Sequence, residues 1–322
     1  MKRTKKNAKA REVSGPTLLL LLLASLLLAL PGCSRCGAAP TGRMHVAVSV
    51  FPIYDLVRTV AGPDADVHLL LPAGHNEHHF DPTPKDVSDA AKAQLFVMVG
   101  LGLDGWMEKL AKDSAPKARL LKVGDRVPTR PMPEMLGEAE AHANAPDDDD
   151  DHHGNTDPHV WLDPSRVRLM VKSIAEELAK QDSAHATAYR ERASTFDAAL
   201  AALDKEAETR TKALTRRGFV TFHGSFGYFA ERYHLDILAV IEPYPGAQPS
   251  SAYLKKVMSV VKEKSVPALY SEPQLDARPA QVLADEAKIP LGILDPVGGG
   301  PDADTYEKLI RFNLAALEKH LR

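Results

Sequence analysis

The sequence predicts an α/β protein with two lobes, each containing a mostly parallel sheet flanked by helices, joined by a long rigid α-helix. Short apolar segments alternate with amphipathic segments between residues 43 and 123, and the same alternation returns between residues 219 and 321. This alternation is typical of parallel strands connected by crossover helices. Between the two halves, residues 184–214 contain neither glycine nor proline, which favours one long helix.

The individual elements follow from the apolar periodicity. In the first half, the predicted strands are His45–Val50, Asp66–Leu71, Gln94–Val99 and Arg119–Val123, and the predicted helices are Ile53–Val60, Pro84–Lys92 and Gly105–Asp113. In the second half, the predicted strands are Phe219–Phe222, Asp236–Ile241, Ala268–Ser271 and Gly292–Leu294. The helices there are Ser225–Tyr233, Ser251–Lys264, Arg278–Ala287 and Asp304–Leu321.

Two helices are predicted between the halves. The first, Pro164–Lys180, has Asp163 as its N-cap and a proline at its first position. The second covers Ala184–Leu214, and its apolar residues Phe196, Leu200, Leu203 and Ala207 fall on one face. About 30 residues at 1.5 Å per residue give roughly 45 Å of helix. That length is enough to run along both lobes.

The N-terminus is typical of an exported lipoprotein. Six basic residues precede an apolar segment, Leu18–Leu30, that is shorter than the roughly 20 residues a membrane-spanning helix needs. Residues 30–33, Leu-Pro-Gly-Cys, resemble a lipobox, so residues 1–32 are predicted to be a signal peptide and Cys33 to carry the lipid that holds the protein to a membrane. Cys36 is a poorer candidate because Arg35 precedes it. Residues 33–42 would then form a tether.

Composition limits the class of protein. The only two cysteines lie beside the cleavage site, so the exported domain has no disulfide framework and no thiolate metal site. About 290 residues remain, which is ample for one or two apolar cores. They carry 34 basic against 42 acidic side chains, a net charge of −8. This acidity argues against nucleic acid as a partner and is compatible with attracting cations.

One segment is predicted to be disordered. Residues 138–155 include five consecutive aspartates, Asp147–Asp151, and like charges in a row repel one another and cannot be buried. The segment also contains His142, His152 and His153, so it is expected to collect cations weakly.

Four side chains are candidate ligands for one metal ion: His78, His159, His223 and Asp295. A single histidine is more often a surface or core residue than a ligand. However, three of these four follow predicted strands, and the carboxyl ends of parallel strands open onto one crevice. His159 is placed by a predicted strand and loop before the helix at Pro164. Three imidazoles and a carboxylate suit Zn²⁺. Because the ligands come from both halves, the ion would lie between the lobes.

Five distinctive segments follow one another along the chain: His78 with the following Phe80–Pro84, then Asp157–Pro164, His223–Tyr228, Ser271–Gln274 and Leu294–Pro296. In this order they resemble the metal-binding solute receptors of bacterial ABC transporters, which take up zinc and manganese. The resemblance extends from His45 to the C-terminus. It implies an N-terminal lobe at 43–182, a linker helix at 183–214 that limits hinge motion, and a C-terminal lobe at 215–322. It also implies a monomeric receptor, without catalysis of its own, in the periplasm or at the cell surface, that delivers Zn²⁺ to a permease and ATPase complex.

The resemblance also ranks the ligands. Its pattern puts the first ligand four residues before Pro82, at His78, and leaves His75 and His79 at the rim, with His79 as a possible secondary ligand. Glu77 is the alternative fourth ligand if Asp295 stays remote. A histidine at 223 favours zinc, because manganese-type relatives commonly have a carboxylate there and oxygen ligands favour the harder ion.

Other functions stay open. Mn²⁺ is the alternative cargo, and an adhesin or a metal-buffering lipoprotein is the alternative role. A zinc hydrolase fits less well, because the chain has no His-Glu-x-x-His motif and lacks the cysteine pair of zinc deaminases.

Overall fold

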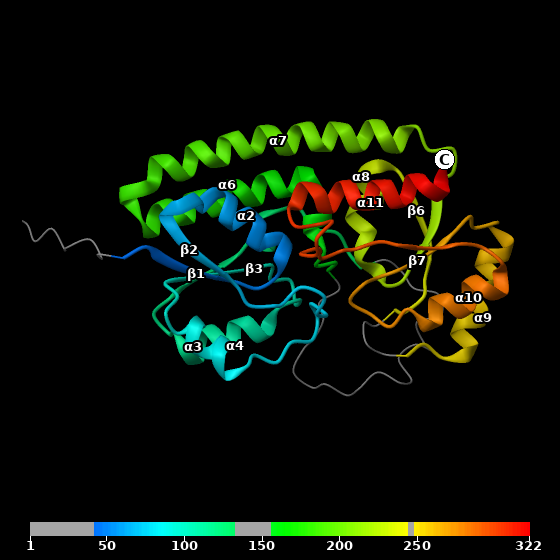
Figure 1. Ribbon diagram of the computed structural model, residues 1–322, viewed down its shortest axis with the longest axis horizontal. Coiled ribbons are helices and arrows are strands. Elements are labelled where there is room, and N and C mark those ends of the chain that lie inside the picture. Colours follow the sequence, from blue (N-terminus) through cyan, green and yellow to red (C-terminus); the bar gives the residue numbers. More distant parts are fainter. Residues whose placement is uncertain (1–41, 133–155, 244–247) are drawn as a thin grey trace, which may run out of the picture. The chain divides into compact units, whose positions relative to one another are not determined.

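Two four-stranded sheets, both parallel throughout, form the framework of the protein (Figure 1). The computed structural model describes residues 42–132, 156–243 and 248–322, and both sheets belong to one unit, Arg43–Arg322. The first sheet has the order β2-β1-β3-β4 and the second β6-β5-β7-β8. Their strands are β1 Met44–Val48, β2 Ala65–Leu69, β3 Leu95–Met98, β4 Arg119–Lys122, β5 Gly218–Thr221, β6 Asp236–Val240, β7 Leu269–Ser271 and β8 Leu291–Ile293. The predicted α/β class and all eight strands are confirmed, with ends that differ by one or two residues.

In both sheets the strand order reverses between the first and the third strand of the lobe. The chain passes from β1 to β2 on one side and then returns to place β3 on the other side of β1, and β5, β6 and β7 repeat this order. Loops that leave the carboxyl ends of the two central strands therefore diverge, which opens a crevice there. Each lobe thus presents one such edge.

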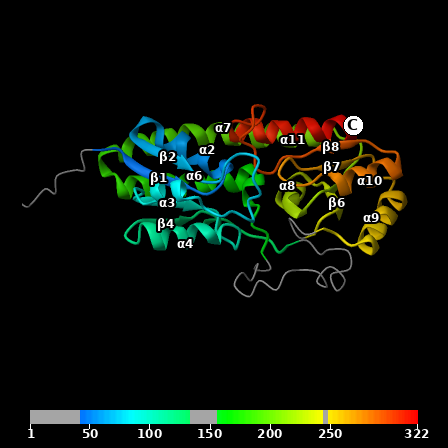
Figure 2. The same ribbon diagram turned by 60° about the horizontal axis from the view of Figure 1, so that its bottom comes forward.

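Helices cover both faces of the first sheet, as Figure 2 shows. Side chains alternate along each strand, so Val46 and Val48 face α2 (Phe51–Ala61) and α6 (Pro164–Gln181). Ala47 and Phe96 belong instead to a second cluster under α3 (Pro84–Ala90) and α4 (Gly105–Ser114). Burial on both faces explains why the central strand β3 and residues 46–48 of β1 are apolar without interruption.

The second sheet is covered in the same way. Val220 and Leu269 pack with α9 (Ser251–Glu263) and α10 (Arg278–Ala287). On the opposite face, Phe219 and Tyr270 join the larger core with α8 (Gly227–Tyr233) and α11 (Tyr306–Leu321). That larger core also contains Val46 of the first sheet, so one continuous apolar cluster runs through both lobes.

The helix α7, Ala186–Lys212, lies along both lobes (Figure 1). Its predicted apolar face, Phe196 to Ala207, is buried. Near its start, Arg192 donates to the carbonyls of Val60 and Ala61 at the end of α2, each at 2.7 Å. Near its end, Arg210 forms two hydrogen bonds, of 3.0 and 2.9 Å, with Glu318 of α11. The linker helix is therefore attached to each lobe by an arginine fork.

A second connection between the lobes lies at the start of α11. The backbone N–H of Tyr306 donates to Asp55 of α2 at 2.7 Å, and its hydroxyl donates to the carbonyl of Trp161 at 2.8 Å. Trp161 in turn donates its indole N–H to the carbonyl of Pro296 at 2.7 Å. These side chains are fully buried, so they fix the two sheets relative to each other.

One predicted helix cap is confirmed, and one predicted strand is contradicted. Asp163 caps α6 by accepting from the N–H of Ser165. The strand expected before His159 is absent from the described residues, where only an isolated bridge pairs Pro131 with Thr156. Turn bonds and a few long-range bonds, such as that from the N–H of Asp157 to the carbonyl of Arg130 at 3.0 Å, hold this segment in place of a ladder.

The predicted signal peptide, Cys33, nearly all of the tether, and the acidic segment with His142, His152 and His153 lie outside the described residues. Within the described ranges, no helix combines the length and the apolar character needed to cross a membrane.

Candidate metal centre

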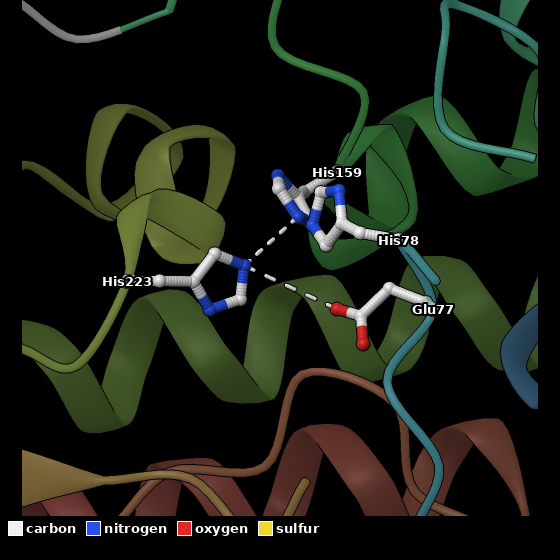
Figure 3. Close-up of side chains that lie close together, drawn as sticks. All are labelled: Glu77, His78, His159 and His223. Carbon is white, nitrogen blue, oxygen red and sulfur yellow. Dashed lines mark hydrogen bonds and ion pairs between the residues drawn. The ribbon is translucent and has the colours of Figure 1, made fainter. Parts of the chain in front are cut away.

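Four side chains converge between the two sheets: Glu77, His78, His159 and His223 (Figure 3). One ligand atom from each lies within 4.8 Å of every other. Nε2 of His223 is 3.2 Å from Nε2 of His159 and 4.0 Å from Oε1 of Glu77. The ring centroids of the three histidines are 5.0–5.5 Å apart. All but the half-buried His78 are buried.

Each ligand lies on a short, tightly bonded segment. His223 follows β5 by two residues, so it lies at the carboxyl end of a central strand. His78 lies in the long loop after β2, where its N–H donates to Oδ1 of Asn76 at 2.9 Å. His159 lies in a turn in which its N–H donates to Oδ1 of Asp157 at 3.0 Å, just before the 3-10 turn Val160–Leu162. These turns aim three imidazoles from both lobes at one point.

Two of the imidazoles contact a carboxylate through Nδ1, the ring nitrogen on the side away from the other ligands. Nδ1 of His159 is 2.9 Å from Oδ1 of Asp157, and Nδ1 of His223 is 2.6 Å from Oε2 of Glu272. Glu272 also accepts from the hydroxyl of Ser225 at 3.2 Å. Metal-binding histidines commonly donate their outer ring N–H to a carboxylate, which directs the other nitrogen at the ion. Both pairs leave Nε2 pointing into the site.

The spacing of the two Nε2 atoms fits a zinc ion. Two Zn–N bonds of about 2.0–2.1 Å at a tetrahedral angle hold their nitrogens about 3.3 Å apart. His159 and His223 have a separation of 3.2 Å. Little rearrangement is therefore needed for these two imidazoles to bind one ion.

Burial controls the protonation of the site. It raises the pKa of Glu77 above its ordinary value, and it raises the pKa of Glu272 to about 8, because a buried carboxylate loses its hydration. Burial lowers the pKa of His223 for the same reason. Burial therefore favours the protonated form of Glu272 in the metal-free site. A bound dication would repel this proton and favour ionised Glu272.

Asp295 is not part of the convergent group. It is buried at the carboxyl end of β8, where its Oδ1 accepts from the N–H groups of Val297 and Gly298 and from the side chain of Gln274, at 2.8–3.0 Å. Its backbone is held on both sides by the amide of Asn313. One oxygen of the expected fourth ligand is thus occupied by its own turn. Glu77, the alternative, lies in the group, and its buried Oε1 has no hydrogen-bond partner among the described residues.

His75 and His79 are exposed and lie outside the group, as expected for rim residues. His79 borders a cavity of about 260 Å³ beside His78, which is also lined by Phe80 and Trp106. Trp161, which packs edge-on against the ring of His159 at 5.3 Å, forms a wall of the ligand's turn.

The sequence did not reveal the roles of Asp157 and Glu272. Both stood inside the quoted motifs, at Asp-Pro-His and Ser-Glu-Pro, but nothing local indicated that they orient imidazoles. Asp157 lies two residues before its histidine, and that spacing was a usable signal. Glu272 lies 49 residues after His223 in the chain, so only the pairing of β5 with β7 brings the two together.

Two parallel sheets bridged by one long helix, with imidazoles from both lobes converging between them, define a metal-binding solute receptor of the rigid-helix type. Residues 46–320 match the family described as ZnuA, the periplasmic component A of a zinc-uptake complex. The chain belongs to this family.

Named relatives agree with this assignment. The chain is 30% identical over 305 residues to the zinc-binding lipoprotein AdcA of Streptococcus pneumoniae, a match that covers 93% of this chain and 60% of AdcA. It thus spans about 60% of the length of that relative. It is 28% identical over 312 residues to the high-affinity zinc uptake system protein ZnuA of Bacillus subtilis, covering 94% and 97% of the two chains.

Solved structures show the same fold. A zinc-bound deletion mutant of ZnuA superimposes with a TM-score of 0.73 at 26% identity, covering 87% of this chain and 98% of that one. The laminin-binding protein of Streptococcus agalactiae, described as an adhesin with metal-transporting activity, has the same TM-score and identity and covers 87% and 100%.

Proposed function

We propose that this protein is a high-affinity extracytoplasmic receptor for Zn²⁺ that delivers the ion to an ABC permease. The observation that carries the proposal is the convergence of three imidazoles and one carboxylate, drawn from both lobes, within 4.8 Å. The carboxylates behind His159 and His223 support it, because they direct ring nitrogens into the site. The named relatives that bind or take up zinc support the same cargo.

The donor set favours zinc over manganese. Imidazole nitrogens suit Zn²⁺, whereas Mn²⁺ prefers carboxylate and carbonyl oxygens. Three of the four convergent groups are nitrogen donors, and the third histidine occupies the place where a carboxylate would favour the harder ion. Mn²⁺ is the alternative cargo, expected to bind more weakly.

We infer that Glu77, rather than Asp295, is the fourth ligand. Glu77 is buried and belongs to the convergent group, while Asp295 uses one oxygen to hold its own turn. His78, His159 and His223 are the other three ligands. His79, His142, His152 and His153 would then contribute only weak, secondary binding.

The remaining parts of the proposal concern placement in the cell. Residues 1–32 direct export, Cys33 carries the lipid anchor, and residues 33–42 tether the lobes 43–182 and 215–322, with helix 183–214 between them. The protein works as a monomer in the periplasm or at the cell surface, and its partners are a permease and its ATPase. It performs no catalysis, since a fourth protein ligand leaves zinc without the open position that a catalytic site keeps.

Calorimetric titration of the mature protein with Zn²⁺ tests the site. We expect one tight ion per chain, with Glu77→Gln weakening binding at least about tenfold and Asp295→Asn by less than Glu77→Gln. Absence of tight zinc binding by the unaltered protein would overturn the function. A larger loss with Asp295→Asn would restore Asp295 as the fourth ligand. Zinc uptake by cells that express this protein together with an ABC permease and its ATPase tests delivery.

A further inference from the structure

Arg130 connects the turn that carries His159 to the opposite lobe. Its Nη1 lies 3.2 Å from Oδ2 of Asp157, the carboxylate that accepts from His159. Its Nε lies 3.1 Å from Oε2 of Glu231 on α8, which belongs to the C-terminal lobe. The same arginine thus contacts the support of a metal ligand and a helix of the other lobe.

The backbone around this contact is also held from α8. The N–H of Arg130 donates to the hydroxyl of Tyr228 at 3.0 Å, and that hydroxyl donates to the carbonyl of Asp157 at 2.8 Å. The N–H of Asp157 donates to the carbonyl of Arg130 at 3.0 Å. Asp157 is fully buried, so both its side chain and its backbone are fixed by groups that do not touch the metal.

Gly227 makes room for the ion pair. A Cβ at this first residue of α8 would lie 1.8 Å from Nη1 of Arg130 and 2.6 Å from Oδ2 of Asp157. The backbone of Gly227 is helical, with φ −57° and ψ −48°, so its conformation does not require glycine. Glycine is therefore needed here for space, because any side chain would occupy the position of the Arg130 guanidinium against α8.

We propose that Arg130, seated against Gly227, is a positioning residue for zinc binding that acts through Asp157 on the ring of His159. The proposal rests on the proposed zinc-receptor function. Arg130 holds the Asp157 carboxylate in place, and that carboxylate keeps Nε2 of His159 directed at the other ligands. No comparable support exists for the other pair, because Glu272 has no arginine or lysine partner in the part of the chain that the structure describes.

Whether removing Arg130 raises or lowers the zinc affinity distinguishes a positioning role from a simple effect of its charge. A guanidinium near the site repels a dication, so its charge alone weakens zinc binding. Removing Arg130 would then tighten binding. A positioning role predicts the opposite, because losing the groups that orient a metal-binding histidine costs about 10–100-fold in affinity.

Zinc affinity of the mature protein, measured by competition with a chelating dye at one pH, tests the proposal. We expect Arg130→Ala to weaken binding about tenfold and Arg130→Lys to have a smaller effect, since lysine keeps the charge but not the fork. Gly227→Ala keeps every charged group, but its Cβ would displace the guanidinium and crowd Oδ2 of Asp157, so it should also weaken binding. Arg168→Ala is the matched control. It removes an arginine that pairs with Asp197 through two hydrogen bonds of 2.7 and 2.9 Å and should leave affinity within about twofold.

A double-mutant cycle distinguishes positioning from general loosening. If Arg130 acts through His159, then Arg130→Ala should weaken binding in the His78→Ala background and have almost no effect in the His159→Ala background. Equal losses in both backgrounds would overturn the proposal, as would unchanged or tighter binding by Arg130→Ala alone. If the unaltered protein does not bind zinc, the receptor function itself fails, which is a separate result.

Discussion

Replacing Glu272 by glutamine should stabilise the metal-free protein while it weakens zinc binding. Glu272 is buried, and burial raises its pKa from 4.5 to about 8. A carboxyl whose pKa is raised on folding binds its proton more tightly in the folded state. Its stabilising contribution is complete below pH 4.5 and is lost as the pH rises through about 8. Glutamine has no such proton, so its contribution does not change with pH.

The size of the effect follows from linkage. Between pH 6 and pH 8 the carboxyl lowers the free energy of unfolding by at most roughly 1 kcal/mol per pH unit, or roughly 2–3 kcal/mol in all. Compared with the unaltered protein, the Glu272→Gln variant should therefore gain up to this amount of stability over that range. For a chain of this size, 1 kcal/mol corresponds to roughly 2–4 °C in melting temperature.

With zinc present, the unaltered protein should be more stable than the Glu272→Gln variant, the opposite of the order expected without metal. The bound dication favours ionised Glu272, which accepts Nδ1–H of His223 at 2.6 Å and directs Nε2 at the ion. Glutamine can present an oxygen to that N–H but carries no charge. We expect a loss of about 10–100-fold in zinc affinity, or about 1.4–2.7 kcal/mol. Binding should also release about one proton fewer, because glutamine has none to give up.

Three measurements check this reasoning: chemical unfolding of the metal-free proteins at pH 6 and pH 8, zinc titration at pH 8, and calorimetry in buffers of different ionisation enthalpy. A stability difference that stays constant between pH 6 and pH 8 would refute the protonated state of Glu272. An unchanged zinc affinity would refute the role of Glu272 in directing Nε2 of His223 at the ion.

Further outcomes follow from the same site. Replacing His78, His159 or His223 by alanine should each weaken zinc binding by at least about tenfold, or roughly 1.4 kcal/mol, while His79→Ala, a matched neighbour outside the group, should stay within about twofold by calorimetry. Because protons compete with zinc for imidazoles whose ordinary pKa is near 6.5, affinity should fall steeply from about pH 7 to pH 5. The zinc-induced rise in melting temperature at non-saturating metal should shrink over the same range, and an equal rise at both pH values would contradict a histidine-dominated site. Deleting residues 138–154 should leave the tight site nearly intact and remove only weak extra zinc, whereas loss of the tight site on titration would show that this segment supplies a ligand.

The sequence by itself determined the fold class and named three of the four side chains that converge in the structure. Apolar periodicity placed all eight strands, and Asp163 with Pro164 marked the start of α6, because these signals act between residues that are close in the chain. Three histidines could be named because each stands in a distinctive turn, and the turns of His78 and His223 follow parallel strands, β2 of one sheet and β5 of the other. The proposed preference for zinc over manganese was inferred from the chemistry of imidazole.

The tertiary structure decided which groups meet. Glu77 joins the three histidines and Asp295 does not, and one oxygen of Asp295 accepts instead from the N–H groups of Val297 and Gly298 in its own turn. Glu272 reaches His223 only because β5 pairs with β7, and Arg130 reaches Asp157 only where Gly227 leaves space. Contacts of this kind join residues from distant parts of the chain, so they depend on how the sheets and helices pack rather than on any local pattern.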